Sequence, residues 1–153
     1  MMDSTSPTGF YPRFWTEFLA RLRDENLYSG DQRPFDVNWM CFPSGYSGLK
    51  YCITFAKEQT FRIQLYIDRG KGKKKANKAL FDALELEKEE IEKELEVHLS
   101  WQRLEHAQAC RIADDRPYTD RDAQRSELIE LGIQRLAKMK QVFDPRIRRL
   151  LRK

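Results

Sequence analysis

Residues 68–78, with the sequence DRGKGKKKANK, have the residue types that could bind a phosphate. They follow the apolar stretch FRIQLYI and precede a long helix-forming stretch, so the lysines lie at a strand-to-helix connection. Lysines near a helix N-terminus oppose its partial positive charge by about 0.3–1 kcal/mol each at low salt. A bound phosphate would relieve this repulsion. Two interpretations stay open, namely an anion-contacting loop and a solvated surface turn.

The spacing in this segment does not match a nucleotide-binding loop. A P-loop needs G-x-x-x-x-G-K-[ST], in which the hydroxyl binds magnesium. Here lysines follow Gly70 and Gly72, without a serine or threonine after them. A dinucleotide-binding G-x-G-x-x-G motif also fails, because Lys75 occupies the position of the third glycine.

Other catalytic arrangements are equally poorly supported. A magnesium nuclease needs an acid-x-lysine triplet within a strand, but residues 63–66 at the centre of the matching strand read IQLY. His98 and His106 flank one expected strand without a nucleophile elbow, and we interpret them as surface residues. The carboxylates between residues 85 and 96 alternate with core positions, which indicates a solvated helix face. We therefore expect no catalytic residue, no metal site and no cofactor.

The hydrophobic pattern predicts an α+β domain with the order α-β-β-β-α-β-β-α. The expected helices cover residues 11–25, 74–96 and 122–143, and the expected strands cover residues 37–42, 49–56, 60–67, 99–104 and 109–114. The short KEQ connection predicts an antiparallel hairpin. Pro145 is expected to disrupt the last helix. Strict alternation in the strands indicates a mainly antiparallel sheet with helices packed on one face.

The chain has 153 residues, enough for one domain with a hydrophobic core. We expect a disordered N-terminus at residues 1–9, a single α+β domain at 10–145 and a basic C-terminal tail at 146–153. No signal peptide or apolar run of membrane-spanning length is visible, so we expect a cytoplasmic protein without a membrane partner.

The three cysteines are Cys41, Cys52 and Cys110. Their spacings match no zinc or disulfide framework. All three lie in apolar or strand-like segments. We interpret them as small buried hydrophobes in a reducing compartment.

The net charge of +4 is concentrated in two regions, the lysine-rich loop and the C-terminal stretch RIRRLLRK. Two basic regions on an otherwise neutral to mildly acidic chain favour local contact with phosphates or with an acidic partner. The sequence therefore predicts a nucleic-acid-binding or anion-binding site with eight residues. They are Arg69, Lys71, Lys73, Lys74, Lys75, Arg146, Arg148 and Arg149.

Several segments together resemble a bacterial domain of unknown function, number 4268. They are FWTEFLARL, SGYSGLKYCI, RIQLYID, ALFDALELEKEEIEKELEVHLSWQRL and VFDPRIRRLL, within residues 12–150. Markers such as the Phe14-Trp15 pair and the turn at 44–48 look structural, so the resemblance implies fold more than activity. Members of this family often follow a domain similar to PD-(D/E)xK restriction nucleases, which implies a DNA context. Only nine residues precede the expected domain, so we expect this chain to act as the accessory domain alone.

The leading hypothesis is a non-enzymatic accessory or interaction domain of a bacterial restriction or phage-defence system. It would contact nucleic acid or an acidic protein partner through the basic loop 69–78 and the basic tail 146–153. One alternative is a degenerate or unusual metal-dependent nuclease-like enzyme, and another is a structural module that self-associates into a homo-oligomer. Tyr46, Tyr66 and Tyr118 are too scattered in the sequence to be assigned base stacking.

Overall fold

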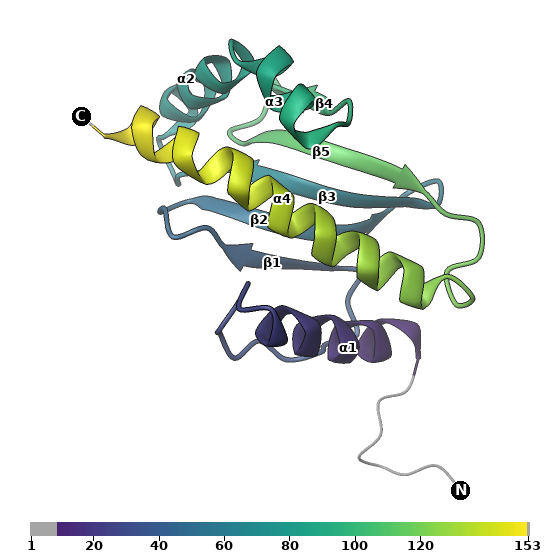
Figure 1. Cartoon of the computed structure of the whole chain (residues 1–153). Coiled ribbons are helices and arrows are strands. Elements are labelled where there is room, and N and C mark those ends of the chain that lie inside the picture. Colours follow the sequence, from purple (N-terminus) through teal and green to yellow (C-terminus); the bar gives the residue numbers. More distant parts are fainter. Residues whose placement is uncertain (1–8, 153) are drawn as a thin grey trace, which may run out of the picture.

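A computed structural model describes residues 9–152, in which a layer of helices packs on one antiparallel sheet (Figure 1). The helices are α1 (Phe10–Asp24), α2 (Lys74–Glu85), α3 (Lys88–Leu95) and α4 (Arg125–Leu151). The strands are β1 (Trp39–Pro43), β2 (Leu49–Ala56), β3 (Thr60–Ile67), β4 (Ser100–Gln102) and β5 (Cys110–Pro117). The predicted α+β class and element order are confirmed, and the second helix is divided into α2 and α3. Residues 1–8 of the segment expected to be disordered lie outside the described residues.

The five strands form one sheet with the order β1-β2-β3-β5-β4, and each neighbouring pair is antiparallel. The hairpin predicted from the KEQ connection is confirmed, because β2 pairs with β3 along its whole length. Ile53 lies opposite Ile63, and Leu65 lies opposite Ile112, so the apolar residues of three strands share one face of the sheet.

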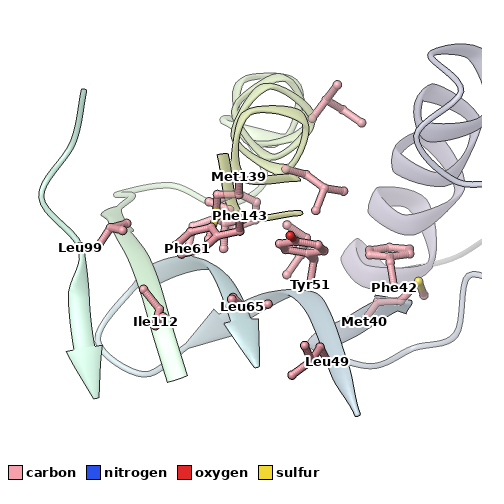
Figure 2. Close-up of a cluster of buried hydrophobic side chains, with 14 of the residues drawn as sticks. Met40, Phe42, Leu49, Tyr51, Phe61, Leu65, Leu99, Ile112, Met139 and Phe143 are labelled. Carbon is pink, nitrogen blue, oxygen red and sulfur yellow. The ribbon is translucent and has the colours of Figure 1, made fainter. Parts of the chain in front are cut away.

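The helices cover this apolar face (Figure 1). The long helix α4 crosses the sheet in contact with β3, and it also contacts α1 and α3. Figure 2 shows Met139 and Phe143 of α4 above Phe61 and Tyr51 of the sheet, and all four are fully buried. The face predicted for the first helix is buried as well, and its residues are Phe14, Trp15, Phe18, Leu19 and Leu22.

Two partly buried polar contacts also attach α4 to the sheet. The hydroxyl of Tyr51 donates to Oδ1 of Asp144 at 2.5 Å, and burial together with this carboxylate raises the pKa of Tyr51. Arg135 donates from Nε to Oδ2 of Asp114 at 3.0 Å, and the Asp114 side chain is only 2% exposed. Each contact gives a polar side chain within the apolar layer a defined partner, which fixes the position of α4 along the sheet.

The prediction that Pro145 disrupts the last helix is wrong, because α4 continues to Leu151. Pro145 removes one intrahelical donor and normally bends a helix at considerable cost. Here Phe143 and Ile147, on either side of it, are both fully buried in the core. Their burial offsets the lost hydrogen bond, so residues 146–151 of the expected tail form the last turns of α4.

The interpretation of the three cysteines as buried free thiols holds only for Cys110 among the described residues. Cys41 and Cys52 form a disulfide between β1 and β2, and buried Cys110 has a free thiol whose pKa is raised by burial. The reason is the strand register, which places Cys41 directly opposite Cys52. The spacing of the cysteines in the sequence does not predict that Cys41 and Cys52 pair. The disulfide also removes the argument for a reducing compartment.

Lys78 is the least expected buried residue, since only 6% of it is exposed. Its ammonium group donates to three backbone carbonyls, those of Arg103 at 2.6 Å, Leu104 at 2.8 Å and Ala109 at 2.9 Å. All three donors of the ammonium group are therefore used. The contact fastens the β4–β5 connection to α2.

We predict that Lys78→Met lowers the free energy of unfolding by about 3 kcal/mol, because methionine keeps the apolar stem but leaves three carbonyls without a charged donor. Urea unfolding would measure this loss. Lys75→Met on the same helix is the control, because Lys75 is exposed and its substitution should change stability little. Equal effects of the two substitutions would contradict the structural role of Lys78.

The disulfide gives a second prediction, on the number of thiols that can be alkylated. Protein unfolded without a reductant should take up one alkyl group, at Cys110, and reduced protein should take up three. Intact mass and peptide mapping would measure both numbers. Three labels without a reductant would show that Cys41 and Cys52 are not paired.

Candidate anion-binding site

The basic loop leaves the sheet at the end of β3 and enters α2. The five predicted cations of this loop are all exposed, and they are Arg69, Lys71, Lys73, Lys74 and Lys75. Within residues 9–152, none of these side chains belongs to an ion pair. Lys78, at the end of the predicted segment, is buried and bonded to carbonyls, so it does not contribute to this surface.

Two side chains and a neighbouring turn hold the backbone of the loop. Fully buried Asn77 accepts from the N–H of Arg69 at 3.0 Å and donates to the carbonyl of Gln108 at 3.1 Å. Asp68 accepts from the N–H of Gly70 at 3.2 Å and from Nε2 of Gln108 at 2.6 Å. The loop therefore has a fixed backbone, from which the lysine side chains extend into solvent.

The turn before β2 supports the loop from the other side. The N–H of Asp68 donates to the carbonyl of Gly48 at 2.9 Å. Gly48 has a φ of +78°, and a Cβ at this residue would lie 2.3 Å from Cα of Arg69. The close approach of the two backbones thus requires glycine at this position.

The first turn of α2 is positively charged and has no capping side chain. Its N-cap residue is Lys73, no side chain caps the helix, and no acidic residue lies in the first turn. The unpaired N–H groups and the adjacent lysines all contribute positive potential at the same place. A bound anion would be attracted to this positive potential.

The three arginines predicted on the last turns of α4 differ in availability. Arg146 is half-buried and donates to Glu87 at 3.0 Å and Glu94 at 2.5 Å. Burial alone would lower the pKa of Arg146, but the two carboxylates raise it. Arg149 also contacts Glu87, whereas exposed Arg148 forms no ion pair within residues 9–152 and donates to the hydroxyl of Tyr46 at 3.3 Å. Arg148 is therefore the arginine best placed to meet an external anion.

The tertiary structure brings the loop and the end of α4 together. They border one groove of about 340 Å³, and Figure 1 shows the C-terminal end of α4 beside α2. Arg69 and Arg149 supply its charged lining. The apolar lining comes from α2 and α4, and it consists of Ala76, Ala79, Leu80, Ala83, Leu150 and Leu151. Sequence reasoning missed this apolar lining, although the alanines of α2 recur at helical spacing.

The other residues considered for chemistry lie elsewhere. His98 and His106 are exposed, and Nδ1 of His98 lies 3.5 Å from Oε1 of Glu92. Among residues 9–152, no group of three or more histidine, cysteine, aspartate or glutamate side chains is placed to hold a metal ion. None of the helices in this range combines the length and apolar character needed to cross a membrane.

The chain belongs to the family described as a domain of unknown function (DUF4268), whose sequence profile matches residues 10–147. No curated protein and no solved structure matches the chain. The matched range contains the entire basic loop and most of α4, but it ends before Arg148 and Arg149. Family membership therefore identifies the domain but assigns it no function.

We predict that Gly48→Ala disturbs the basic loop and that Gly45→Ala does not. Both glycines have positive φ, so alanine strains both, by about 1 kcal/mol. A Cβ at Gly45 meets nothing within 4 Å, whereas one at Gly48 meets the backbone of Arg69. Gly48→Ala should therefore lose clearly more stability in urea unfolding, and hydrogen exchange at Asp68 should accelerate. Equal losses and unchanged exchange would show that the turn does not support the loop.

Proposed function

We propose that this chain is a non-enzymatic accessory domain that binds the phosphates of nucleic acid in a bacterial restriction or phage-defence system. One observation carries the proposal: Arg69 of the basic loop and Arg149 of α4 line the same groove, although eighty residues separate them in sequence. The DNA-associated context comes from the family resemblance and the cytoplasmic location from the sequence. Both remain part of the proposal, and the Cys41–Cys52 disulfide counts against the second.

The chemistry of the loop suits phosphate contact. Its lysines are exposed, lack intramolecular ion pairs among the described residues and adjoin the uncapped N-terminus of α2. Flexible ammonium groups neutralise phosphates without reading base sequence. The proposed binding therefore provides affinity for nucleic acid in general, and it is weakened by salt.

The loop should contribute more to this binding than the end of α4. Arg146 and Arg149 are already neutralised by Glu87, and Arg146 also by Glu94. A phosphate at either arginine would have to replace a carboxylate. Variants of the loop are therefore the most informative ones.

The apolar lining of the groove supports a second candidate, a binding site for an acidic amphipathic protein segment. Leu80, Leu150 and Leu151 would contact its apolar side, and Arg69 would meet its carboxylates. A phosphate backbone has no apolar group to bury against these leucines. Salt distinguishes the candidates, because apolar burial is not screened as charge is.

The test is a fluorescence anisotropy titration of the protein into labelled double- and single-stranded DNA at about 50 and 200 mM salt. With about four phosphate contacts, affinity for the duplex should fall roughly 100-fold between the two concentrations. Replacing Lys71, Lys73, Lys74 and Lys75 together by alanine should weaken binding and flatten the salt dependence, because each lost contact lowers the slope by about 1.

A variant with the same change in net charge is the control. It replaces four exposed cations on other parts of the molecule, which are Arg13, Arg33, Lys57 and Lys93. It should bind almost as well as the unmodified protein. Equal weakening in both variants, or no binding at 50 mM salt, would overturn the proposal. Cleavage of the DNA on addition of magnesium would instead support the nuclease-like alternative.

A further inference from the structure

The second face of the sheet, turned away from the helices, carries polar and aromatic side chains. Its residues are given by the strand register, because every second residue of a strand points to the same face. One row across the strands lies at the end of the sheet where the basic loop begins. This row consists of Pro43, Lys50, Tyr66, Arg111 and Gln102.

Two polar atoms on this face lack hydrogen-bond partners among the described residues. They are Oε1 of Gln64 and Nε of Arg111. Gln64 is only 6% exposed and points to the same face as Arg111, from the neighbouring row and the adjacent strand. Unpaired buried polar atoms are rare in native proteins. Here one hydrogen-bond acceptor and one donor remain unpaired on residues of neighbouring rows.

Tyr66 lies in the same row, with Lys50 and Arg111 as its cross-strand neighbours. It is half-buried and lies two residues before Asp68, where the basic loop begins. The other two tyrosines considered for stacking differ: Tyr118 packs against Phe55 at 6.0 Å, and Tyr46 contacts Arg148. Of the three, Tyr66 is the one that the fold places on the uncovered face.

The charge of this face favours an anionic ligand. Lys50, Arg62 and Arg111 contribute three positive charges, and Asp115, paired with Arg62 at 2.7 Å, contributes one negative charge. Burial, together with repulsion from Arg62, lowers the pKa of Arg111. Among residues 9–152, Arg111 has no carboxylate partner, and its one side-chain hydrogen bond is to Oε1 of Gln102 at 3.3 Å. A phosphate nearby would relieve the repulsion between the cations.

We propose that this face binds the bases of a single-stranded nucleic acid. This inference rests on the proposed function and names the substrate class. A base stacks on the ring of Tyr66, and its polar edge supplies a donor to Gln64 and an acceptor to Arg111. The phosphates on either side reach Lys50 and the basic loop.

Single strands fit this site because their bases are free to leave the stack. In a duplex, base faces are stacked and their pairing edges are occupied, so only phosphates would reach the protein. Both unpaired atoms are buried, so binding requires the side chains of Gln64 and Arg111 to rotate toward the base. The site thus combines a stacking ring, a pair of hydrogen-bonding atoms and adjacent cations.

The first test compares a labelled oligo-deoxythymidylate of about fifteen nucleotides with a duplex of the same length, by anisotropy at about 50 mM salt. Tyr66→Leu should weaken single-strand binding roughly 10-fold, the ordinary effect of losing one stacked base, and leave duplex binding unchanged. Tyr66→Phe keeps the ring and should retain binding. Phe35→Leu is the control, because Phe35 is an exposed aromatic (61%) in the connection before β1, outside the strands that form this face.

A second measurement needs no variant, so it remains valid if Tyr66→Leu does not fold. Unmodified protein is irradiated with an oligonucleotide that contains bromodeoxyuridine, and the crosslinked peptide is identified by mass spectrometry. We expect a crosslink at Tyr66 in β3. Crosslinks confined to peptides that do not line this face would overturn the inference.

The outcomes separate this inference from the proposed function. No binding of either DNA overturns both. Binding that depends on the loop lysines but not on Tyr66, with equal affinity for single strands and duplex, overturns only the inference. Single-strand binding that depends on Tyr66 but not on the loop lysines supports the inference and overturns the role given to the loop.

Discussion

The ammonium group of Lys78 is the contact on which the architecture around the site depends. Three carbonyls of the β4–β5 connection accept its hydrogen bonds, so the edge of the sheet and α2 hold each other in place. The adjacent residue Asn77 is also buried, and its side chain accepts a hydrogen bond from the backbone N–H of Arg69. A lysine next to the basic loop thus supplies the structural support for that loop, while the exposed lysines remain available to a ligand.

The two proposed surfaces meet at one end of the sheet and would divide the recognition of nucleic acid between them. The loop and the end of α4 offer mobile or partly neutralised cations, which suit phosphates of any sequence. The open face offers a ring at Tyr66 and unpaired atoms at Gln64 and Arg111, which suit unstacked bases. Carboxylates such as Glu87 limit the positive charge at the end of α4, so binding there would be weaker than the arginine count suggests.

Much of the fold could be predicted because its signals are local. Alternation in β2 and β3 and the helical spacing of α1 depend on residues a few positions apart, so the element order and the buried face of α1 follow from sequence. The features that sequence reasoning missed depend on residues far apart. Helix α4 continues through Pro145 because the sheet and the other helices bury its flanking residues, and this burial is not visible in the local pattern.

The sequence by itself determined that this is an α+β domain with an exposed basic loop between a strand and a helix. Only the tertiary structure decided which cations are free: it buried Lys78, paired Arg146 with two glutamates and left Lys71 exposed. Register alone placed Cys41 opposite Cys52 and Tyr66 beside Arg111. The physical reason is that charge and residue type are properties of single positions, whereas pairing and burial depend on what the rest of the chain brings near.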